Sequence, residues 1–567
     1  MGQRIQDGTA VPDTVVDRIA LTLAVLLSLA AYLPRLGFYS DDWSFFGAYA
    51  TAESPTVGGY FRASYSAHHA MRPVQLWLCA IAYRVFGLEP LGYHLFNAAL
   101  IVLNPLLCYS LLRELQVHRV VALPVAFIYA LLPSYSTDRY WFLAFAITLS
   151  MTACLASMLA DVRAAAVGGR IGYAWKAAGL AAALVSGLAY EVALPLLLLT
   201  PVLMTIRTWQ SVRRPGRRRA LQLAVFLVVH VALLAAMVGF KLRTTVRLGA
   251  GEGALRAQIT YIAGEAFRTD VPEGAYGLNV FTAARVHFGT YGVFLGRTAA
   301  TAARLAPAWL QWGTIAFGAA AFLYLVFALR AGPWPSRGGW AAVIVAGLVV
   351  FSLGYAVFLT NYNVQFTAAG IANRSAIAAA LGAALCLVGV GGLVASLTHG
   401  RVRAIGLAAF IAMAGSSGLL ILNVVANCWA EAWAVERAIL AGIQQRFPTL
   451  PPHSTLLLDG VCPYVGPAVV FEANWDLAGA LHTLYRDPTL KADVVTPRLT
   501  VTSDAIVTTI YQQPTSYPYA NELFVYHAGT GAVHRLPDAA AARAYFAQST
   551  HAAACPPAQE GVGVRLF

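Results

Sequence analysis

Two adjacent carboxylates, Asp41 and Asp42, follow the first long apolar run of the sequence, within Tyr39-Ser40-Asp41-Asp42-Trp43. Ionisable side chains at the edge of a bilayer are costly, which favours a functional role. A carboxylate there can serve as a general base toward a hydroxyl group. The pair also fits a helix N-cap before Trp43, because Ser and Asp side chains accept hydrogen bonds from the first turn of a helix. Both roles stay open on the local residues.

Three further polar side chains lie between apolar runs. Asp138 either caps a helix or adds a second functional acid, and its neighbour Arg139 is the expected partner. Glu191 has no cap-like neighbour, which favours a function or a buried partner. Arg374 could hold a phosphate or diphosphate through paired hydrogen bonds, or it could simply extend to the membrane interface.

Composition indicates the class of protein that must position these groups. Hydrophobic residues make up 59% of the 567 residues, charged residues only 11%, and the mean hydropathy is +0.63. Soluble domains carry about 25% charged residues, so the chain is a polytopic membrane protein. The net charge of +13 comes from Arg residues between the apolar runs, as in topology determinants. We therefore expect no nucleic-acid binding. Only Cys462 and Cys555, in the polar tail, could form a disulfide, which would require an oxidising compartment.

Eleven apolar runs approach the length needed to cross a bilayer, and the third and sixth are short. They lie near residues 18–37, 90–112, 120–133, 141–160, 176–190, 192–206, 221–242, 312–330, 339–360, 375–398 and 404–427. His230 is the main polar group expected in mid-span. The polar N-terminus does not resemble a cleavable signal. The fold class expected is mainly α, a polytopic transmembrane helix bundle.

The basic residues predict the orientation of these spans. Every even-numbered junction between the apolar runs carries Lys or Arg, Lys176 among them, which predicts a cytoplasmic N-terminus. The membrane expected is a bacterial inner or plasma membrane. Lys241, Arg243 and Arg247 break this rule, but they begin a long outside loop, 243–311, and long translocated loops are largely exempt. The first outside loop, 38–89, contains a segment, Arg72 to Arg84, expected to lie as a helix on the membrane surface. Similar stretches span 254–267 and 281–304.

The tail has ordinary polarity and predicts a second domain. We expect a transmembrane domain, 1–428, and a small extracytoplasmic α/β domain, 429–567. Strands are expected at Thr455 to Leu458, Glu522 to His527 and Ala532 to Leu536, the last two joined by a Gly529-Thr530-Gly531 turn. Helices are expected at Trp433 to Arg446 and Asp538 to Ala547.

Three sequence segments together resemble the GT-C superfamily of integral membrane glycosyltransferases, including bacterial enzymes and O-mannosyltransferases. They are Tyr39-Ser40-Asp41-Asp42-Trp43, Met71-Arg72-Pro73-Val74, and the stretch from Val85-Phe86-Gly87 through Tyr93-His94-Leu95-Phe96-Asn97. The likeness covers about residues 18–200, reaches Arg374 more loosely and says little about the tail.

The resemblance implies transfer of a sugar from a polyprenyl-phosphate donor to an acceptor on the noncytoplasmic side. Asp41 would be the general base of one inverting displacement, Asp42 would orient Asp41 or the acceptor, and Asp138 would match the family's second-loop acid. Arg374 would hold the lipid phosphate. Candidates for lining the substrate cavity are Arg72, His94, Glu191 and Arg139. The acceptor could be a glycan, lipid or protein, membrane lipids are further partners, and no cofactor is certain, although a divalent metal is possible.

Other functions make different demands on the sequence. A transporter or flippase of lipid-linked glycans would place ionisable residues deep within several spans and would show an internal repeat. A polysaccharide polymerase or ligase is chemically closer and would differ in its Arg-rich outside loops.

Overall fold

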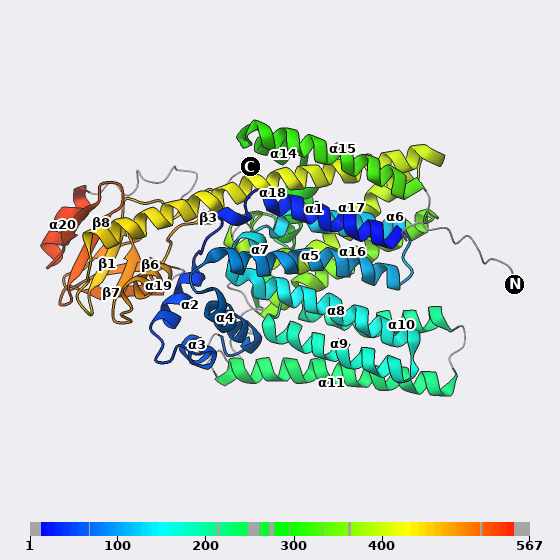
Figure 1. Cartoon of the computed structure of the whole chain (residues 1–567), viewed down its shortest axis with the longest axis horizontal. Helices are drawn as coiled ribbons and strands as arrows, with labels where there is room; N and C mark the ends of the chain where they lie inside the picture. Colours follow the sequence, from blue (N-terminus) through cyan, green and yellow to red (C-terminus); the bar gives the residue numbers. More distant parts are fainter. Residues whose placement is uncertain are drawn as a thin grey trace.

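The computed structural model describes residues 13–66, 69–212, 216–247, 260–261, 263–271, 277–293, 295–330, 333–360, 364–510 and 513–548. A long bundle of helices carries a smaller domain of strands and helices at one end (Figure 1). Short helices of the first predicted outside loop lie at the same end. The helices that follow the predicted spans are α1 Asp13–Ala30, α5 Pro90–Glu114, α6 Arg119–Leu131, α8 Phe145–Val167, α9 Gly169–Ala189, α10 Thr200–Ser211, α11 Arg217–Arg247, α15 Ala308–Arg330, α16 Arg337–Ala356, α17 Ile377–Ala395 and α18 Gly400–Arg446.

All eleven predicted runs form helix, but they differ in length. Among the described residues, nine helices are long and apolar enough to cross a membrane. The two remaining runs are the two that the sequence marks as short: α6 has 13 residues, and α10 has 12 and is preceded by the 3-10 turn η4, Leu194–Leu199. The fold is therefore a mainly helical membrane bundle.

Helix α8 forms the centre of the bundle. Its apolar window is 89% buried, against 22% for the peripheral helix α11. Small residues let α16 and α17 pack closely, as membrane helices do when no water drives their association. A Cβ on Gly354 would lie 2.4 Å from the backbone nitrogen of Ala379, and a Cβ on Gly382 would lie 2.2 Å from that of Phe351. Larger side chains at these positions would force the two helices apart.

The helix ends that carry the predicted cytoplasmic charges meet away from the C-terminal domain. Glu114 at the end of α5 forms ion pairs with Arg163 of α8, at 3.4 Å, and with Arg207 of α10, at 3.2 Å. Arg119 at the start of α6 pairs with buried Asp17 of α1, at 2.6 Å. Lys176 is a correction: it lies inside α9, not in a loop, because buried Asp161 of α8 neutralises it at 2.8 Å.

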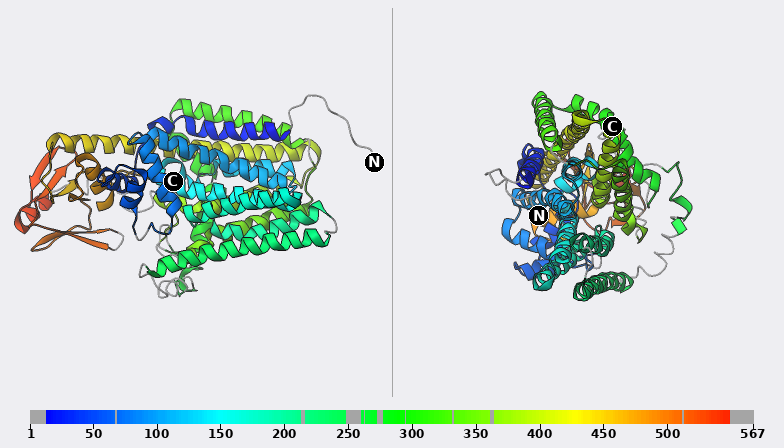
Figure 2. Two further views of the ribbon diagram at one scale, coloured as in Figure 1. Left: turned by 60° about the horizontal axis from the view of Figure 1, so that its bottom comes forward. Right: turned by 90° about the vertical axis from the view of Figure 1, so that its right-hand side faces the viewer.

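Helix α18 joins the bundle to the C-terminal domain. It runs for 47 residues without a break, so the helix expected at Trp433 to Arg446 is the continuation of the last predicted span. Figure 2 shows this helix leaving the bundle and passing along the domain.

The C-terminal domain confirms the predicted strands and adds others. Its main sheet has the order β4-β1-β8-β9, in which β1 is parallel to β4 and β8, and β8 pairs with β9 as an antiparallel hairpin. The strands are β1 Thr455–Asp459, β2 Tyr464–Val465, β3 Ala468–Val469, β4 Lys491–Val494, β5 Thr500–Val501, β6 Ala505–Ile510, β7 Gln513–Pro518, β8 Leu523–His527 and β9 Ala532–Arg535. Helices α19 Asn474–Tyr485 and α20 Ala539–Gln548 complete it. Cys462 is disulfide-bonded, and Cys555, its expected partner, lies outside the described residues.

The two predicted outside loops form short helices. The first contains α2 Asp41–Ala50, α3 Val57–Ser64 and α4 Pro73–Phe86, the last being the predicted surface helix. The second contains α13 Val280–Ala284, the π-helix η5 Arg285–Val293 and α14 Leu295–Leu305, whereas half of the stretch 254–267 lies outside the described residues. Helix α2 packs against α19 at a glycine crossing, since a Cβ on Gly47 would lie 2.7 Å from the Gly479 carbonyl oxygen. This crossing places the C-terminal domain directly beside the acidic pair.

Candidate functional site

Three segments far apart in the sequence meet at the end of the bundle that carries the C-terminal domain. They are the start of α2, with Asp41; the short helix α7 Thr137–Tyr140, with Asp138; and the 3-10 segment η7 Ile371–Ala376, with Arg374. Arg374 interacts electrostatically with both carboxylates. The structure thus brings together three of the residues chosen from the sequence.

Asp41 is partly buried and has a perturbed pKa. Burial raises its pKa above the ordinary value, while Arg374, an interaction with Trp475 of α19, and Arg72 each act to lower it. A carboxylate with a raised pKa is a stronger base, provided it is still ionised at the working pH. Arg374 and Arg72 oppose the effect of burial, so they favour the ionised form that a general base needs.

Asp138 is fully buried, and neither of its carboxylate oxygens has a hydrogen-bond partner. Burial raises its pKa well above the ordinary value, and Arg374 followed by Arg139 lower it. Buried polar groups are nearly always hydrogen-bonded, so an exception requires an explanation. Capping does not explain it, because α7 starts after Ser136 and Asp138 lies inside the helix. The structure therefore leaves both oxygen atoms of a buried carboxylate without a hydrogen-bond partner beside Arg374.

Asn373 links the Arg374 segment to the Asp138 segment. Its side-chain oxygen accepts a hydrogen bond from the Thr137 amide at 3.0 Å, and its amide group donates to Ser136 at 3.1 Å and to the Pro133 carbonyl at 3.2 Å. Asn97 of α5 donates to the Asp138 carbonyl at 2.6 Å. The guanidinium of Arg374 stacks on Trp141 with its carbon 4.9 Å from the ring centre. These contacts fix the position of Arg374 relative to Asp138.

Asp42 is buried and satisfied by backbone groups. Its carboxylate accepts from the Tyr39 amide at 2.9 Å and from the Leu143 amide at 3.1 Å. The predicted N-cap is not formed, because α2 begins at Asp41 and its N-cap residue, Ser40, makes no side-chain cap hydrogen bond. Asp42 instead ties the residue before α2 to the segment after Asp138. Asp41 has the freer carboxylate of the two. A direct catalytic role for Asp42 stays a prediction.

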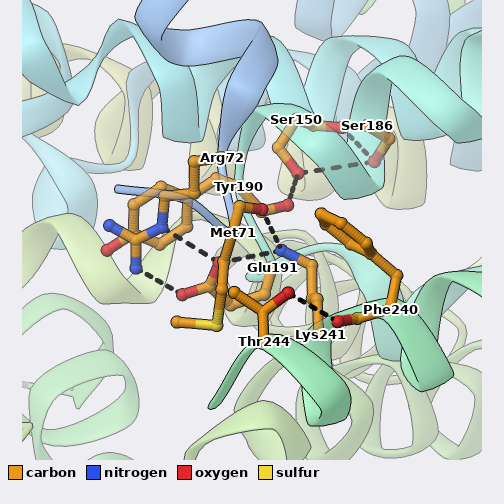
Figure 3. Close-up of polar contacts among 9 residues, drawn as sticks. All are labelled: Met71, Arg72, Ser150, Ser186, Tyr190, Glu191, Phe240, Lys241 and Thr244. Atoms are coloured by element: carbon orange, nitrogen blue, oxygen red, sulfur yellow. Dashed lines mark hydrogen bonds and ion pairs between the residues drawn. The ribbon is translucent and has the colours of Figure 1, made fainter. Parts of the chain in front are cut away.

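Glu191, Arg72 and Lys241 form an ion cluster (Figure 3). Glu191 accepts two hydrogen bonds from Arg72, one of them at 3.1 Å, and Lys241 of α11 lies 3.4 Å away. Arg72 also covers the ring of Tyr190 at 3.8 Å. Burial would raise the pKa of Glu191, but Arg72 and Lys241 outweigh it and lower the pKa to about 2. Glu191 thus holds two cations, and one of them, Arg72, also acts on Asp41.

His94 and Arg139 are buried and make their hydrogen bonds inside the bundle. His94 is buried and hydrogen-bonds the Gly37 carbonyl at 2.8 Å, which fixes the chain just before the acidic pair. The expected pairing of Arg139 with Asp138 is wrong: buried Arg139 donates to Ser28 of α1 at 3.0 Å and to the Ala130 carbonyl. A guanidinium satisfies the free carbonyls at the end of a helix, here α6. Both residues support the site without facing it.

No protein-family model matches the chain, and no curated protein does. Solved structures that are similar to it include two of one protein. The crystal structure of ArnT from Cupriavidus metallidurans bound to undecaprenyl phosphate has 17% identity and a TM-score of 0.36, covering 86% of this chain and 87% of that chain. The apo structure of the same protein has 16% identity and a TM-score of 0.33, covering 78% and 82%. Likeness at this level does not assign an activity.

The described residues contain no group of three His, Cys, Asp or Glu side chains that could hold a metal ion. The predicted possibility of a divalent metal thus finds no protein ligand set in the part of the chain that the structure covers.

Sequence reasoning missed Asn373, Trp475 and the role of Lys241. Lys241 carried a usable signal, because it breaks the positive-inside rule and so needs a local anion. Asn373 and Trp475 carried none, because their roles depend on tertiary contacts between distant segments.

Proposed function

We propose that the chain is a membrane glycosyltransferase of the GT-C type, which moves a sugar from a polyprenyl-phosphate donor to an acceptor hydroxyl on the extracytoplasmic side. The donor's isoprenoid tail needs hydrocarbon-facing helices, and its phosphate needs a cation at the end of the bundle, which Arg374 can supply. The basic ends of α5, α8 and α10 lie at the other end of the bundle, which supports a cytoplasmic N-terminus.

The reaction is one inverting displacement. The acceptor oxygen attacks the anomeric carbon as its proton passes to the Asp41 carboxylate. The bond from that carbon to the phosphate oxygen breaks, and the phosphate leaves with the electron pair. Arg374 holds the phosphate and stabilises the charge that develops on it.

Asp138 completes the site as the second acid. Its unpaired carboxylate oxygens suit a sugar hydroxyl, which would supply the missing hydrogen bond. The Arg72, Glu191 and Lys241 cluster adds positive charge beside Asp41 and fixes the first outside loop against α9 and α11.

The convergence of Asp41 and Asp138 on Arg374 carries this proposal. The test assays purified protein for transfer from undecaprenyl-phosphate-linked glucose, mannose, galactose and arabinose. Asp41→Asn should lower transfer by ~10²- to 10⁴-fold and leave the folded state intact. Glu89→Gln is a matched control, because Glu89 is an exposed acid of the same loop and makes no side-chain cap bond. Full activity of Asp41→Asn would refute the assignment.

One observation favours a flippase as the second candidate. Asp161, Lys176 and His230 come from three different bundle helices and form a buried cluster, with His230 3.2 Å and Lys176 2.8 Å from the Asp161 carboxylate. Ionisable groups deep in several spans are typical of transporters. Movement of a fluorescent undecaprenyl-phosphate lipid across proteoliposomes, abolished in Asp161→Asn, would support transport. Glycosyl transfer retained in that variant would support the transferase.

A further inference from the structure

A groove of about 680 Å³ separates the first outside loop from the C-terminal domain. Helices α2 and α3 form one wall, and α19 with the segment after it forms the other. Polar and aromatic residues that line it include Ser44, Thr51, Glu53, Arg62, Trp475 and His482. Its volume lies within the range of ~300–1,000 Å³ that is typical of small-molecule sites.

Two residues that line the groove connect it to the proposed general base. Ser44 lies one turn after Asp41 on α2, and its hydroxyl donates to the Asp41 carbonyl at 3.0 Å. Trp475 both lines the groove and interacts with the Asp41 carboxylate. A molecule seated against Trp475 would therefore have its end close to the carboxylate that must take its proton.

The lining indicates the chemistry of the occupant. Glu53 and Arg62 are exposed and charged, Ser44 and Thr51 offer hydroxyl groups, and Trp475 offers an aromatic surface. Helices α2, α3 and α19 lie beyond the bundle, on the side of the C-terminal domain (Figure 1). An isoprenoid tail would leave these charged groups unpaired and would have to leave the hydrocarbon. A hydroxyl-rich molecule satisfies the polar groups and stacks its C–H faces on the indole.

We infer that this groove binds the acceptor and that the acceptor presents a glycan there. The inference rests on the proposed function for the role of Asp41, and it assigns the C-terminal domain one wall of the acceptor site. Trp475 is the contact that places a sugar hydroxyl at Asp41.

The test measures glycan binding and sugar transfer separately. Binding of soluble cellobiose, maltotriose, mannobiose, galactobiose and arabinobiose to the whole purified protein is followed by saturation-transfer NMR. At least one glycan should bind, and Trp475→Ala or the double variant Glu53→Gln with Arg62→Gln should weaken it at least about tenfold. The double variant changes exposed side chains, so it guards against misfolding of Trp475→Ala.

A blocking experiment supplies the matched control. Ala63→Cys puts a thiol at the exposed edge of the groove, and Ala540→Cys puts one on exposed α20, away from it. Labelling with a bulky maleimide should abolish glycan binding only at position 63. Glycan binding that survives the label, or no binding by any of the five glycans, overturns the inference. Asp41→Asn should keep glycan binding and lose transfer; binding without transfer in the wild-type protein would count against the proposed function and leave the groove assignment standing.

Discussion

The side-chain oxygen of Asn373 accepts a hydrogen bond from the Thr137 amide at 3.0 Å. This contact fixes two short segments, each next to a functional candidate, because Arg374 follows Asn373 and Asp138 follows Thr137. The Thr137 hydroxyl adds a second link by donating to the Gly370 carbonyl at 2.7 Å. The relative placement of cation and acid thus depends on a neutral amide that has no chemistry of its own.

Replacing Asn373 should misplace Arg374. We expect Asn373→Ala to lower sugar transfer about 10- to 100-fold, since a shift of about 1 Å in a positioned group costs rate on that scale. Steady-state transfer rates measure it. Ser375→Ala is the control, because the Ser375 hydroxyl bonds only within its own segment, to Ala372 at 3.0 Å. Equal losses in both variants would contradict the positioning role.

Asp138→Asn should separate activity from stability. Burial raises the pKa of Asp138, so the folded state is stabilised as pH falls through that raised pKa and is penalised at neutral pH. Removing the unpaired charge should raise the free energy of unfolding at pH 7 by about 1–3 kcal/mol and lower transfer. Thermal unfolding in detergent between pH 7 and pH 5 checks whether Asp138→Asn is more stable than the unchanged protein. It also checks whether the variant's stability depends less on pH. A destabilised variant would show that Asp138 has a structural partner.

The pH dependence of transfer should report the charge on Asp41. A general base works only when ionised, so activity falls as pH drops through the pKa of Asp41, which lies above its ordinary value of 3.8. Arg374 lowers that pKa, so Arg374→Gln should move the acid limb of kcat/KM to higher pH. Arg374→Lys keeps the charge and should leave the limb in place while raising KM for the donor. If the acid limb does not move in Arg374→Gln, Arg374 does not act on the pKa of Asp41.

The sequence predicted the bundle well because hydrophobic length and basic junctions are local properties of the chain. It also selected Asp41, Asp138 and Arg374, although it could not show that they meet. It misjudged Arg139 because adjacency suggested a pair, whereas successive side chains of a helix point in different directions. Trp475 could not be found, because its role arises only from the packing of α19 on α2.

The Arg72 and Glu191 pair should stabilise the first outside loop. Both side chains are about a quarter exposed or less, so Glu191→Gln should cost about 1–2 kcal/mol, less than a fully buried pair. Because the pKa of Glu191 is lowered to about 2, the stabilisation is complete above the unfolded pKa of about 4.3 and is lost between there and pH 2. A double-mutant cycle with Arg72→Gln measures the coupling. Glu265→Gln, which breaks the solvent-accessible pair with Arg268, should leave stability nearly unchanged.

The glycine crossing of α2 and α19 should control the C-terminal domain. A Cβ on Gly479 would lie 2.3 Å from the Trp43 carbonyl oxygen, a backbone atom that cannot move aside. Gly479→Ala should therefore lower the free energy of unfolding by about 1–3 kcal/mol and expose α19 to protease. It should also lower transfer, because Trp475 would move away from Asp41. Binding of undecaprenyl phosphate should persist, since Arg374 is outside this contact. Gly406→Ala on α18 is the control, because its Cβ would meet no atom within 4 Å. If Gly479→Ala keeps full transfer while its domain is loosened, the bundle alone performs the reaction and the domain has another purpose.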